Sequence, residues 1–421
     1  MRTGLSLEKI TAWGGYLLLV LLPLQTRYIL VSSANPFAMI SVYGFDILLV
    51  LVGLLWLWHW YRSNTPVNWT AVSIGLALLA VAGCSAFFAE DRTLALYYWL
   101  HLAAGLWLLA IVATTKLNHT TLLSILTLSG CIQVLAGTIQ FITQHVVANK
   151  WLGMSSQFPE LSGTSVVITA TGRWLRAYAL LPHPNLTGGL IVLALVSAAL
   201  LSKKYWAIAI AGGVLSFGLL LTFSRGALVA WCVSLVIMVV GKQVRASFVL
   251  ATLAVLIVTI AVYWPLVSTR TTQTGITQTY TEQLSLSERR DQLQQFTELM
   301  KTRWPFGVGI GQYTITANNT NALDYAQPIH NVALMILVEM GVLGALLWLA
   351  LLVQAIWKWQ YQIIRHPAAY LLAACLALSV FDHYLWTLPT GLFLMMVMIG
   401  WLHLPVPQHQ PKMTKTSSHY K

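Results

Sequence analysis

Long apolar segments alternate with short polar connections along almost the whole chain. Many of these segments contain about 20 residues with few charges, the length that crosses the hydrocarbon core of a bilayer. The pattern predicts an all-α, polytopic integral membrane protein with a single transmembrane domain over residues 1–421. The predicted spans number about twelve: 11–31, 41–61, 70–88, 94–114, 120–143, 186–202, 205–221, 225–241, 246–267, 331–357, 368–386 and 388–404.

Two connections are much longer than the others, at residues 144–185 and 268–330. In the second, residues 268–281 are rich in Thr and Gln and are expected to be irregular. Residues 287–300 are expected to form an amphipathic helix, with Leu293, Phe296, Leu299 and Met300 on one face. Such a helix would lie on the membrane surface or cover a cavity.

Composition agrees with the hydropathy pattern, since 57% of the residues are hydrophobic and only 9% are charged. The net charge of +12 is explained by topology. If the N-terminus is cytoplasmic, the short cytoplasmic connections and the tails hold thirteen of the 24 Lys and Arg residues but a single acid, Glu8. We therefore expect both termini in the cytoplasm and both long connections outside it.

Three arginines are candidates for binding a charged substrate on the outer side. Arg176 precedes His183-Pro184-Asn185, where Asn185 is expected to cap the sixth span. Arg225 lies between two spans, and Arg290 begins the predicted surface helix. Guanidinium groups bind phosphate bidentately, so their convergence would suit a phosphate or pyrophosphate. The alternative is that each arginine only reaches toward lipid head groups.

His330 and Asn331 stand where a polar loop enters the tenth predicted span. The positive end of the helix dipole favours a neutral imidazole there, which can accept a proton from a hydroxyl group. The alternative is a histidine that only caps the helix or contacts the interface. Glu339 is a carboxylate within the span and needs a polar partner, while Gly341 would allow close helix packing.

Several functions are disfavoured by what the sequence lacks. It has no Walker loop, so no ATP-driven pump is indicated. It has no outward cluster of Asp and Glu of the kind that binds divalent cations, so we expect no metal and no cofactor. The basic residues do not cluster as in a nucleic-acid-binding protein.

The order of these motifs resembles the O-antigen ligase and polymerase superfamily. The resemblance rests on residues 224–227 (Ser-Arg-Gly-Ala), on Arg290 fifteen residues before the Pro305–Gly311 motif, and on His330-Asn331 followed by Leu334, Glu339, Gly341 and Gly344. It covers about residues 170–350. The family usually has an aromatic residue shortly after the arginine, where this chain has 291–294, so Arg289 remains an alternative to Arg290.

The resemblance implies a membrane-embedded glycosyltransferase of the GT-C type. Such enzymes move a glycan from an undecaprenyl pyrophosphate carrier to an acceptor, such as the lipid A core, on the outer face of the bacterial plasma membrane. Their chemistry is inverting and metal-independent, and their partners are the lipid-linked glycan, the acceptor and membrane lipids. By motif position the catalytic residues would be His330, Arg225 and Arg290, and the substrate-binding residues would be Arg176, Asn331 and Asn185.

Two other functions stay open. One is a repeat-unit polymerase, or a transferase that acts on another surface polysaccharide or on protein. The other is a flippase for lipid-linked oligosaccharides or another transporter, which should line several spans with polar residues at the membrane midplane. Here the polar residues concentrate instead on the predicted outer side.

Overall fold

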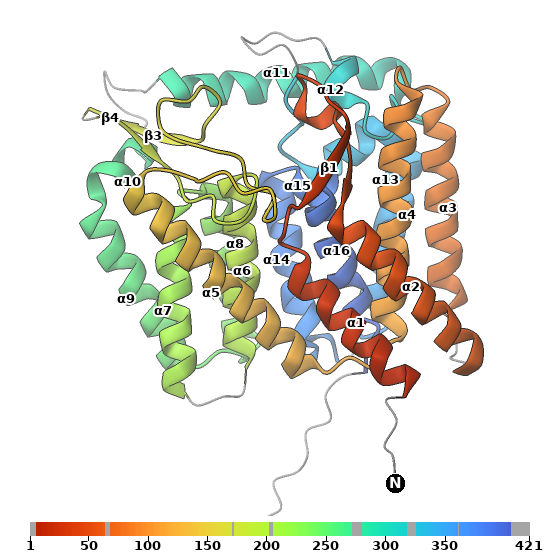
Figure 1. Cartoon of the computed structure of the whole chain (residues 1–421), viewed down its shortest axis with the longest axis horizontal. Helices are drawn as coiled ribbons and strands as arrows, with labels where there is room; N and C mark the ends of the chain where they lie inside the picture. Colours follow the sequence, from red (N-terminus) through yellow and green to blue (C-terminus); the bar gives the residue numbers. More distant parts are fainter. Residues whose placement is uncertain are drawn as a thin grey trace, which may run out of the picture.

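Long helices stand side by side in the computed structural model and are covered at one end by hairpins and short helices (Figure 1). The structure describes residues 6–63, 68–170, 172–201, 205–271, 280–317, 326–360 and 362–405. The long helices in the bundle are α1 (Leu7–Leu21), α2 (Gly44–Ser63), α3 (Trp69–Ala86), α4 (Arg92–Thr114), α5 (His119–Thr143), α6 (Pro184–Leu200), α7 (Tyr205–Leu221), α8 (Arg225–Val240), α9 (Ala246–Val262), α13 (Val332–Trp357), α14 (Pro367–Phe381) and α16 (Pro389–Trp401).

The smaller elements are mostly gathered at the upper end of the bundle in Figure 1. Strands β1 (Arg27–Val31) and β2 (Ile40–Tyr43) form one antiparallel hairpin, and β3 (Val166–Thr169) and β4 (Gly172–Leu175) form another. The short helices are η1 (Pro36–Ala38), α10 (Trp264–Thr271), α12 (Tyr313–Thr316), η2 (Ile363–Arg365) and α15 (Tyr384–Thr387). The longer α11 (Tyr280–Arg303) lies across the upper end (Figure 1).

Five helices are long and apolar enough to cross a membrane by length and composition: α2, α3, α4, α5 and α13. Six shorter apolar helices accompany them among the described residues. The chain is therefore a mostly helical membrane protein, as predicted. Each predicted span overlaps one long helix, but the number of spans that cross the bilayer stays a prediction.

Three predicted spans end well before the expected residue. The first, at 11–31, was wrong beyond Leu21, because residues 27–31 form the exposed strand β1. Its sequence, RYILV, is rich in the β-branched and aromatic residues that favour strands. The ninth, at 246–267, ends at Val262, and the eleventh, at 368–386, ends at Phe381. The last correction places Asp382 and His383 in a connection.

Two helices, α6 and α16, form the centre of the bundle. Nearly every residue of α6 is buried, and so is every residue from Thr390 to Trp401 in α16. A helix that is apolar on all sides is stable when other helices surround it. Here α6 packs against α5, α7, α8 and α14, and α16 packs against α4 and α14. Both helices begin at the upper end, so their first residues have fixed positions there.

Helix α13 is broken at Gly341, whose backbone adopts φ 67° and ψ −172°. At the break, backbone groups of α13 form hydrogen bonds with the segment that begins at Trp304. The N–H of Val308 donates to the carbonyl of Val338 at 2.9 Å, and the N–H of Val342 donates to the carbonyl of Trp304 at 2.9 Å. A Cβ at Gly341 would stand 2.2 Å from the Pro305 carbonyl oxygen. The residue therefore allows backbone contact and a kink, a more specific role than the helix packing expected.

Glu339 lies in the same stretch and has the polar partner that the sequence required. Its carboxylate accepts a hydrogen bond of 2.7 Å from the indole N–H of Trp386 in α15. Glu339 and Trp386 are both buried. The bond ties α13 to the α14–α15 corner, which carries part of the site described below.

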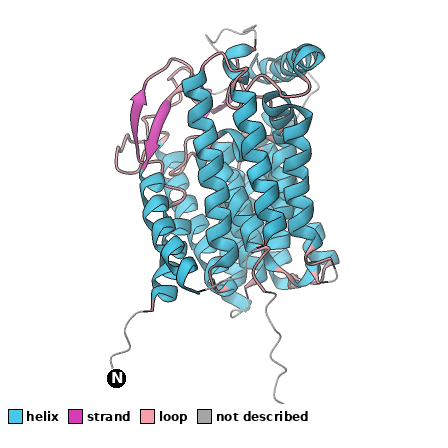
Figure 2. Cartoon of the chain, turned by 90° about the vertical axis from the view of Figure 1, so that its right-hand side faces the viewer, coloured by secondary structure: helices cyan, strands magenta, loops and turns pink. Residues whose placement is uncertain are grey.

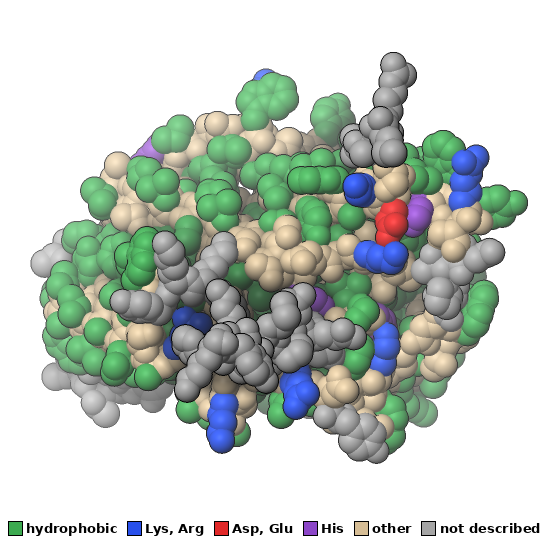
Figure 3. Space-filling view, turned by 90° about the horizontal axis from the view of Figure 1, so that it is seen from below, with side chains coloured by type: hydrophobic (Ala, Val, Ile, Leu, Met, Phe, Trp, Pro, Cys, Tyr) green, Lys and Arg blue, Asp and Glu red, His purple; other side chains and the backbone are tan. Residues whose placement is uncertain are grey.

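The two ends of the bundle differ in composition. Figure 2 shows the helices roughly parallel, with a strand hairpin at the end opposite the N-terminus. The end that carries the N-terminus displays many more Lys and Arg than Asp and Glu side chains (Figure 3). Helices α2, α4, α8 and α13 end in or next to Arg62, Lys116, Lys242 and Lys358. This distribution has the form expected for a cytoplasmic face, although the compartment itself stays a prediction.

Candidate functional site

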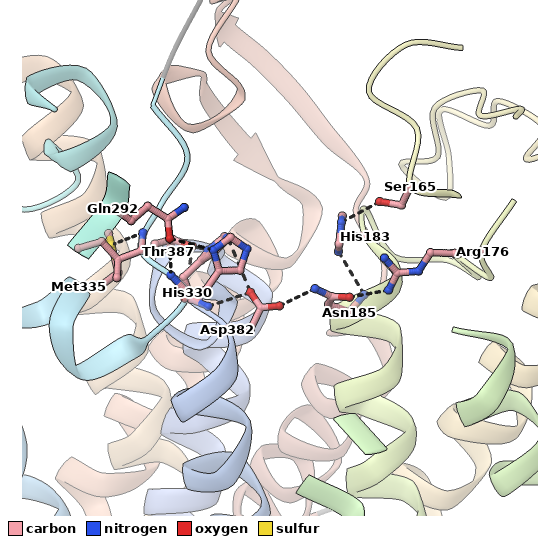
Figure 4. A network of polar contacts seen from close by, with 11 residues as sticks. Ser165, Arg176, His183, Asn185, Gln292, His330, Met335, Asp382 and Thr387 are labelled. Carbon is pink, nitrogen blue, oxygen red and sulfur yellow. Dashed lines mark hydrogen bonds and ion pairs between the residues drawn. The ribbon is translucent and has the colours of Figure 1, made fainter. Parts of the chain in front are cut away.

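Polar side chains from distant parts of the chain converge at the upper end of the bundle (Figure 4). They border a cavity of about 440 Å³, a size within the range of ligand sites. The β1–β2 hairpin, the first long connection, the segment before α13 and the α14–α15 corner all contribute walls. The cavity is lined in part by Arg27, His183, Asn185, His330, Asp382 and His383.

The start of α6 supplies the first part of the site. Residue His183, rather than Asn185, caps this helix: its ring Nδ1 accepts from the backbone N–H of Asn185 at 3.1 Å. Pro184 stands at the first helical position, where its missing N–H is not needed. The expected capping role of Asn185 was therefore wrong, because the residue lies two positions beyond the cap, inside the helix. Its side chain is available for other contacts.

The amide of Asn185 bridges Arg176 and Asp382. Its Oδ1 accepts a hydrogen bond of 2.6 Å from Arg176, and its Nδ2 donates one of 2.7 Å to Oδ2 of Asp382. The buried Arg176 also donates through Nε to the carbonyl of Thr222 at 2.7 Å. This network connects α6, the turn before α8 and the end of α14 (Figure 4).

A glycine at the start of α6 permits this convergence. A Cβ placed on Gly189 would stand 2.1 Å from the hydroxyl oxygen of Tyr384, which is buried in α15. Any larger side chain would push the α14–α15 corner away from α6. The glycine therefore helps to hold Asp382 within hydrogen-bonding reach of Asn185.

His330 comes from the segment just before α13 and contacts α11. Its Nδ1 lies 3.2 Å from Oε1 of Gln292, and its ring meets that of His383 edge to face, with centroids 5.5 Å apart. Because an amide oxygen only accepts, Nδ1 carries the proton and Nε2 of the neutral ring carries a lone pair. Burial lowers the pKa of His330, and the charge of Arg289 contributes to this. The expected neutral imidazole follows mainly from burial, a different cause from the helix dipole.

Asp382 is the acid of the site. Burial by itself would raise the pKa of Asp382, but the neighbouring imidazoles, His383 first, and the hydrogen bond from Asn185 hold it below its ordinary value. The backbone N–H of His383 donates to Oδ1 of Asp382 at 2.8 Å. Burial lowers the pKa of His383 to about 4. At neutral pH the group is therefore a carboxylate among neutral imidazoles.

Two further predicted residues, Arg225 and Asn331, do not line the cavity. Arg225 is exposed at the first position of α8, after the capping Ser224, and Arg176 holds the same turn through the Thr222 carbonyl. Asn331 caps α13 by accepting from the N–H of Leu334 at 3.0 Å. The structure thus gives Asn331 a capping role, and brings Arg176 and Asn185 together with His330 through Asp382.

Arg289 and Arg290 are neighbours in α11, and the helix directs their side chains differently. Gln292 is buried against His330, and Arg289 precedes it by three residues, so the two share a face. Arg290 precedes Gln292 by two residues, so the two side chains point to nearly opposite sides of the helix. Arg289 and Arg290 are both exposed. Leu293, expected on the apolar face, is 53% exposed, so whether that face lies against the membrane stays a prediction.

Three residues of the site were not identified from the sequence: Gln292, Asp382 and His383. Gln292 was noted only because an aromatic residue was expected near it. The pair Asp382-His383 fell inside the eleventh predicted span, 368–386. A lone carboxylate beside a histidine in such apolar surroundings is itself a functional signal, and this signal could have found it.

His330, Asp382 and His383 form a group that could hold a metal ion. One ligand atom from each lies within 4.8 Å of the others, within the part of the chain that the structure describes. Nδ1 of His330 and Nδ1 of His383 contact Gln292 and Thr387 Oγ1, so the two Nε2 atoms would be the ligands. Two imidazoles and one carboxylate suit a catalytic zinc site. Metal independence consequently remains a prediction to be tested.

The fold and this site define a multi-pass helical membrane protein with a polar, histidine-containing cavity at one end. Residues 210–349 match the family model described as O-Antigen ligase. The match confirms the resemblance found in the sequence motifs and indicates a ligase- or polymerase-type glycan transferase. It includes Arg225, Arg290 and His330, whereas Arg176, Asn185 and Asp382 lie outside it. No curated protein matches the chain.

Proposed function

We propose that the protein is an inverting, metal-independent glycosyltransferase of the O-antigen ligase type. It moves a glycan from undecaprenyl pyrophosphate to an acceptor such as the lipid A core, on the outer face of the plasma membrane. The observation that carries this proposal is the contact of His330 Nδ1 with Gln292 at the wall of the polar cavity. That contact leaves the other ring nitrogen as a base.

His330 would act on the acceptor. Its Nε2 takes the proton of the acceptor hydroxyl while the hydroxyl oxygen attacks the anomeric carbon of the glycan. The bond between that carbon and the pyrophosphate oxygen breaks, its electron pair leaves with the pyrophosphate, and attack from the opposite face inverts the centre. The ionised Asp382 stabilises the imidazolium that forms, since its charge raises the proton affinity of His330.

The arginines would act on the leaving group. A departing pyrophosphate gains negative charge, and prearranged guanidinium groups stabilise such charge. Arg225 and one of Arg289 or Arg290 are exposed at the upper end, where a lipid-linked head group has access. Arg176 contributes indirectly, because it holds the turn that presents Arg225. Asn185 contributes in the same way by fixing Asp382.

Variants at Arg225 and His330 test this division of roles. Arg225→Ala should nearly abolish transfer, and Arg225→Lys should recover only part of it, because an ammonium group cannot bind two phosphate oxygens as a fork. His330→Ala should keep carrier binding but lose about 10²–10⁴-fold in transfer rate. The measurements are donor binding and glycan transfer, made separately on purified protein.

Two results would contradict the proposal. A His330→Ala variant with the wild-type transfer rate would leave the histidine with a structural role only. An Arg225→Ala variant that binds and turns over donor normally would make Arg225 a head-group anchor. The matched control is Arg62→Ala, which removes an arginine from the opposite end of the bundle, at the end of α2.

A deletion strain separates the ligase from the polymerase alternative. Loss of a ligase leaves polymerised glycan on its carrier, whereas loss of a polymerase leaves single repeat units. We expect polymerised, carrier-linked glycan to accumulate. Accumulation of single units would assign the same catalytic residues to a polymerase.

A further inference from the structure

A second pocket, separate from the polar cavity, lies between α2, α4 and the β1–β2 hairpin. It has a volume of about 530 Å³ and is almost entirely apolar. Helices α2 and α4 pack together (Figure 1), and Leu30, Val50, Leu96 and Leu100 border the pocket as exposed side chains. In a bilayer such a groove opens sideways to the lipid chains.

The inner wall of the groove carries an unusual polar pair, Asp46 and His101. Nε2 of His101 lies 3.6 Å from Oδ2 of Asp46, too far for a hydrogen bond. The Nδ1–H of His101 donates to the carbonyl of Tyr97 at 3.0 Å. Among the described residues, neither Nε2 of His101 nor Oδ1 of Asp46 has a hydrogen-bond partner, although both atoms are buried.

Burying a polar atom without a hydrogen-bond partner destabilises a protein, so such a pair points to a ligand group. His101 is only 7% exposed and lines the groove. A hydroxyl group can both donate and accept a hydrogen bond, so one placed beside the pair can donate to Oδ1 of Asp46 and contact Nε2 of His101. An amide N–H can also donate to Asp46. Either group satisfies atoms that the protein itself leaves without partners.

The carboxylate also excludes one of the two lipids that the proposed reaction needs. A pyrophosphate group would be repelled by Asp46, and an isoprenoid chain has no hydrogen-bonding group to offer along its length. An acyl chain that carries a hydroxyl or amide fits both the apolar walls and the polar pair. The acceptor lipid is the partner that meets this description.

The groove lies directly behind a wall of the polar cavity. Tyr43 lines that cavity, and its backbone N–H donates to Oδ2 of Asp46 at 2.9 Å. Arg27 donates to the hydroxyl of Tyr43 at 3.2 Å from the cavity side. A lipid seated in the groove would therefore hold its head group beside the cavity that contains His330.

We propose that this groove binds a hydroxylated or amide-linked acyl chain of the acceptor lipid, with Asp46 and His101 as its polar contacts. This inference rests on the proposed function for the identity of the lipid as acceptor. The groove itself is tested by binding alone, without donor and without transfer. Failure of the groove and failure of the proposed function can therefore be told apart.

The experiment uses two probes that differ by one hydroxyl: N-butyl-3-hydroxytetradecanamide and N-butyltetradecanamide. Binding to the purified full chain in detergent is measured by titration and native mass spectrometry. Wild type should bind the hydroxylated probe about tenfold more tightly, the scale of one added hydrogen bond. In Asp46→Asn the amide oxygen can still accept from the backbone N–H of Tyr43, as Oδ2 does now. The amide nitrogen, a donor, then replaces Oδ1, the acceptor that has no partner. This variant should show a smaller preference for the hydroxylated probe and still bind the plain amide, because a hydroxyl group binds a neutral amide less strongly than a carboxylate.

A matched pair of tryptophan variants tests the position. Val50 and Leu54 stand one turn apart on the same exposed face of α2, at 47% and 56% exposure, but only Val50 lines the groove. Val50→Trp should abolish binding of both probes, and Leu54→Trp should leave it unchanged. Equal affinity of wild type for the two probes, or unchanged binding in Val50→Trp, would overturn the proposal. Binding that persists while transfer assays fail would remove the acceptor assignment alone.

Discussion

Asn185 donates a hydrogen bond of 2.7 Å to the carboxylate of Asp382, a residue 197 positions further along the chain. The same amide accepts from Arg176, so it separates an arginine from a carboxylate that would otherwise attract each other. This arrangement keeps the carboxylate of Asp382 directed toward the histidines of the cavity. One neutral side chain therefore forms hydrogen bonds with two buried charged groups.

Replacing Asn185 by alanine should therefore destabilise the protein more than loss of a surface amide would. Asn185→Ala removes a donor from Asp382 and an acceptor from Arg176, and we expect a loss of about 1–3 kcal/mol in stability. The pKa of Asp382 should rise, because the bond from Asn185 helps to lower it. Thermal unfolding in detergent is the measurement, with Asn118→Ala at the exposed cap of α5 as control. Equal unfolding temperatures for the two variants would show that the bridge contributes nothing special.

Gln292 should set the acid side of the pH–rate profile through His330. The pKa of His330 is lowered below 6.5, so the ring is neutral, and competent as a base, down to a pH below that value. In Gln292→Glu a carboxylate would face Nδ1–H and favour the imidazolium, which raises the pKa. The acid limb should then move to higher pH. Gln292→Leu, which lacks the charge, should lower the rate without that upward shift.

This pair of variants distinguishes positioning from packing. If Gln292 only fills space against α13, the two substitutions should change the rate without moving the acid limb. A shift in Gln292→Glu alone supports contact with the titrating group. Transfer should fall more than donor binding in both variants, since the direct contact of Gln292 is with the proposed base, His330.

The helices could be predicted from the sequence because hydropathy over about 20 residues decides whether a segment is stable in lipid. Segments 205–221 and 225–241 were placed to within a residue for this reason. The strand Arg27–Val31 was missed since it is as apolar as a span. The segment forms a strand because it pairs with β2, and the hydropathy of one segment contains no information on such pairing.

The site could be predicted only in part. His330 and the arginines stood out because charged or titratable groups are rare near spans. The role of Asp382 depends on the approach of Tyr384 to Gly189, a contact between helices distant in sequence. A single sequence carries no information on such pairings. The exchange of capping roles between His183 and Asn185 is a local shift of two residues, below the accuracy of boundaries read from a pattern.

The orientation of the bundle is tested by reporter fusions. A reporter near Thr279 should read as extracytoplasmic, and reporters near Lys203 and Lys412 should read as cytoplasmic. All three positions lie outside the described residues. The physical reason is the basic end shown in Figure 3, which favours the cytoplasmic side. A cytoplasmic signal near Thr279 would place the polar cavity in the wrong compartment for an outer-face transferase.

Chelation tests whether His330, Asp382 and His383 work without a metal. We expect transfer by purified protein to persist in EDTA, because arginines stabilise the leaving pyrophosphate directly and His330 needs only its lone pair. The geometry of the three residues makes this a demanding test, since their ligand atoms lie within 4.8 Å of one another. The control is His383→Ala, which removes one ligand of that group and leaves His330 in place.

If EDTA abolishes transfer, added Zn²⁺ or Mg²⁺ restores it, and His383→Ala cannot be restored, the three residues form a metal centre and the proposed mechanism is wrong. If EDTA has no effect on wild type, His383→Ala should lose activity only to the extent that it alters the pKa of Asp382, which His383 helps to lower.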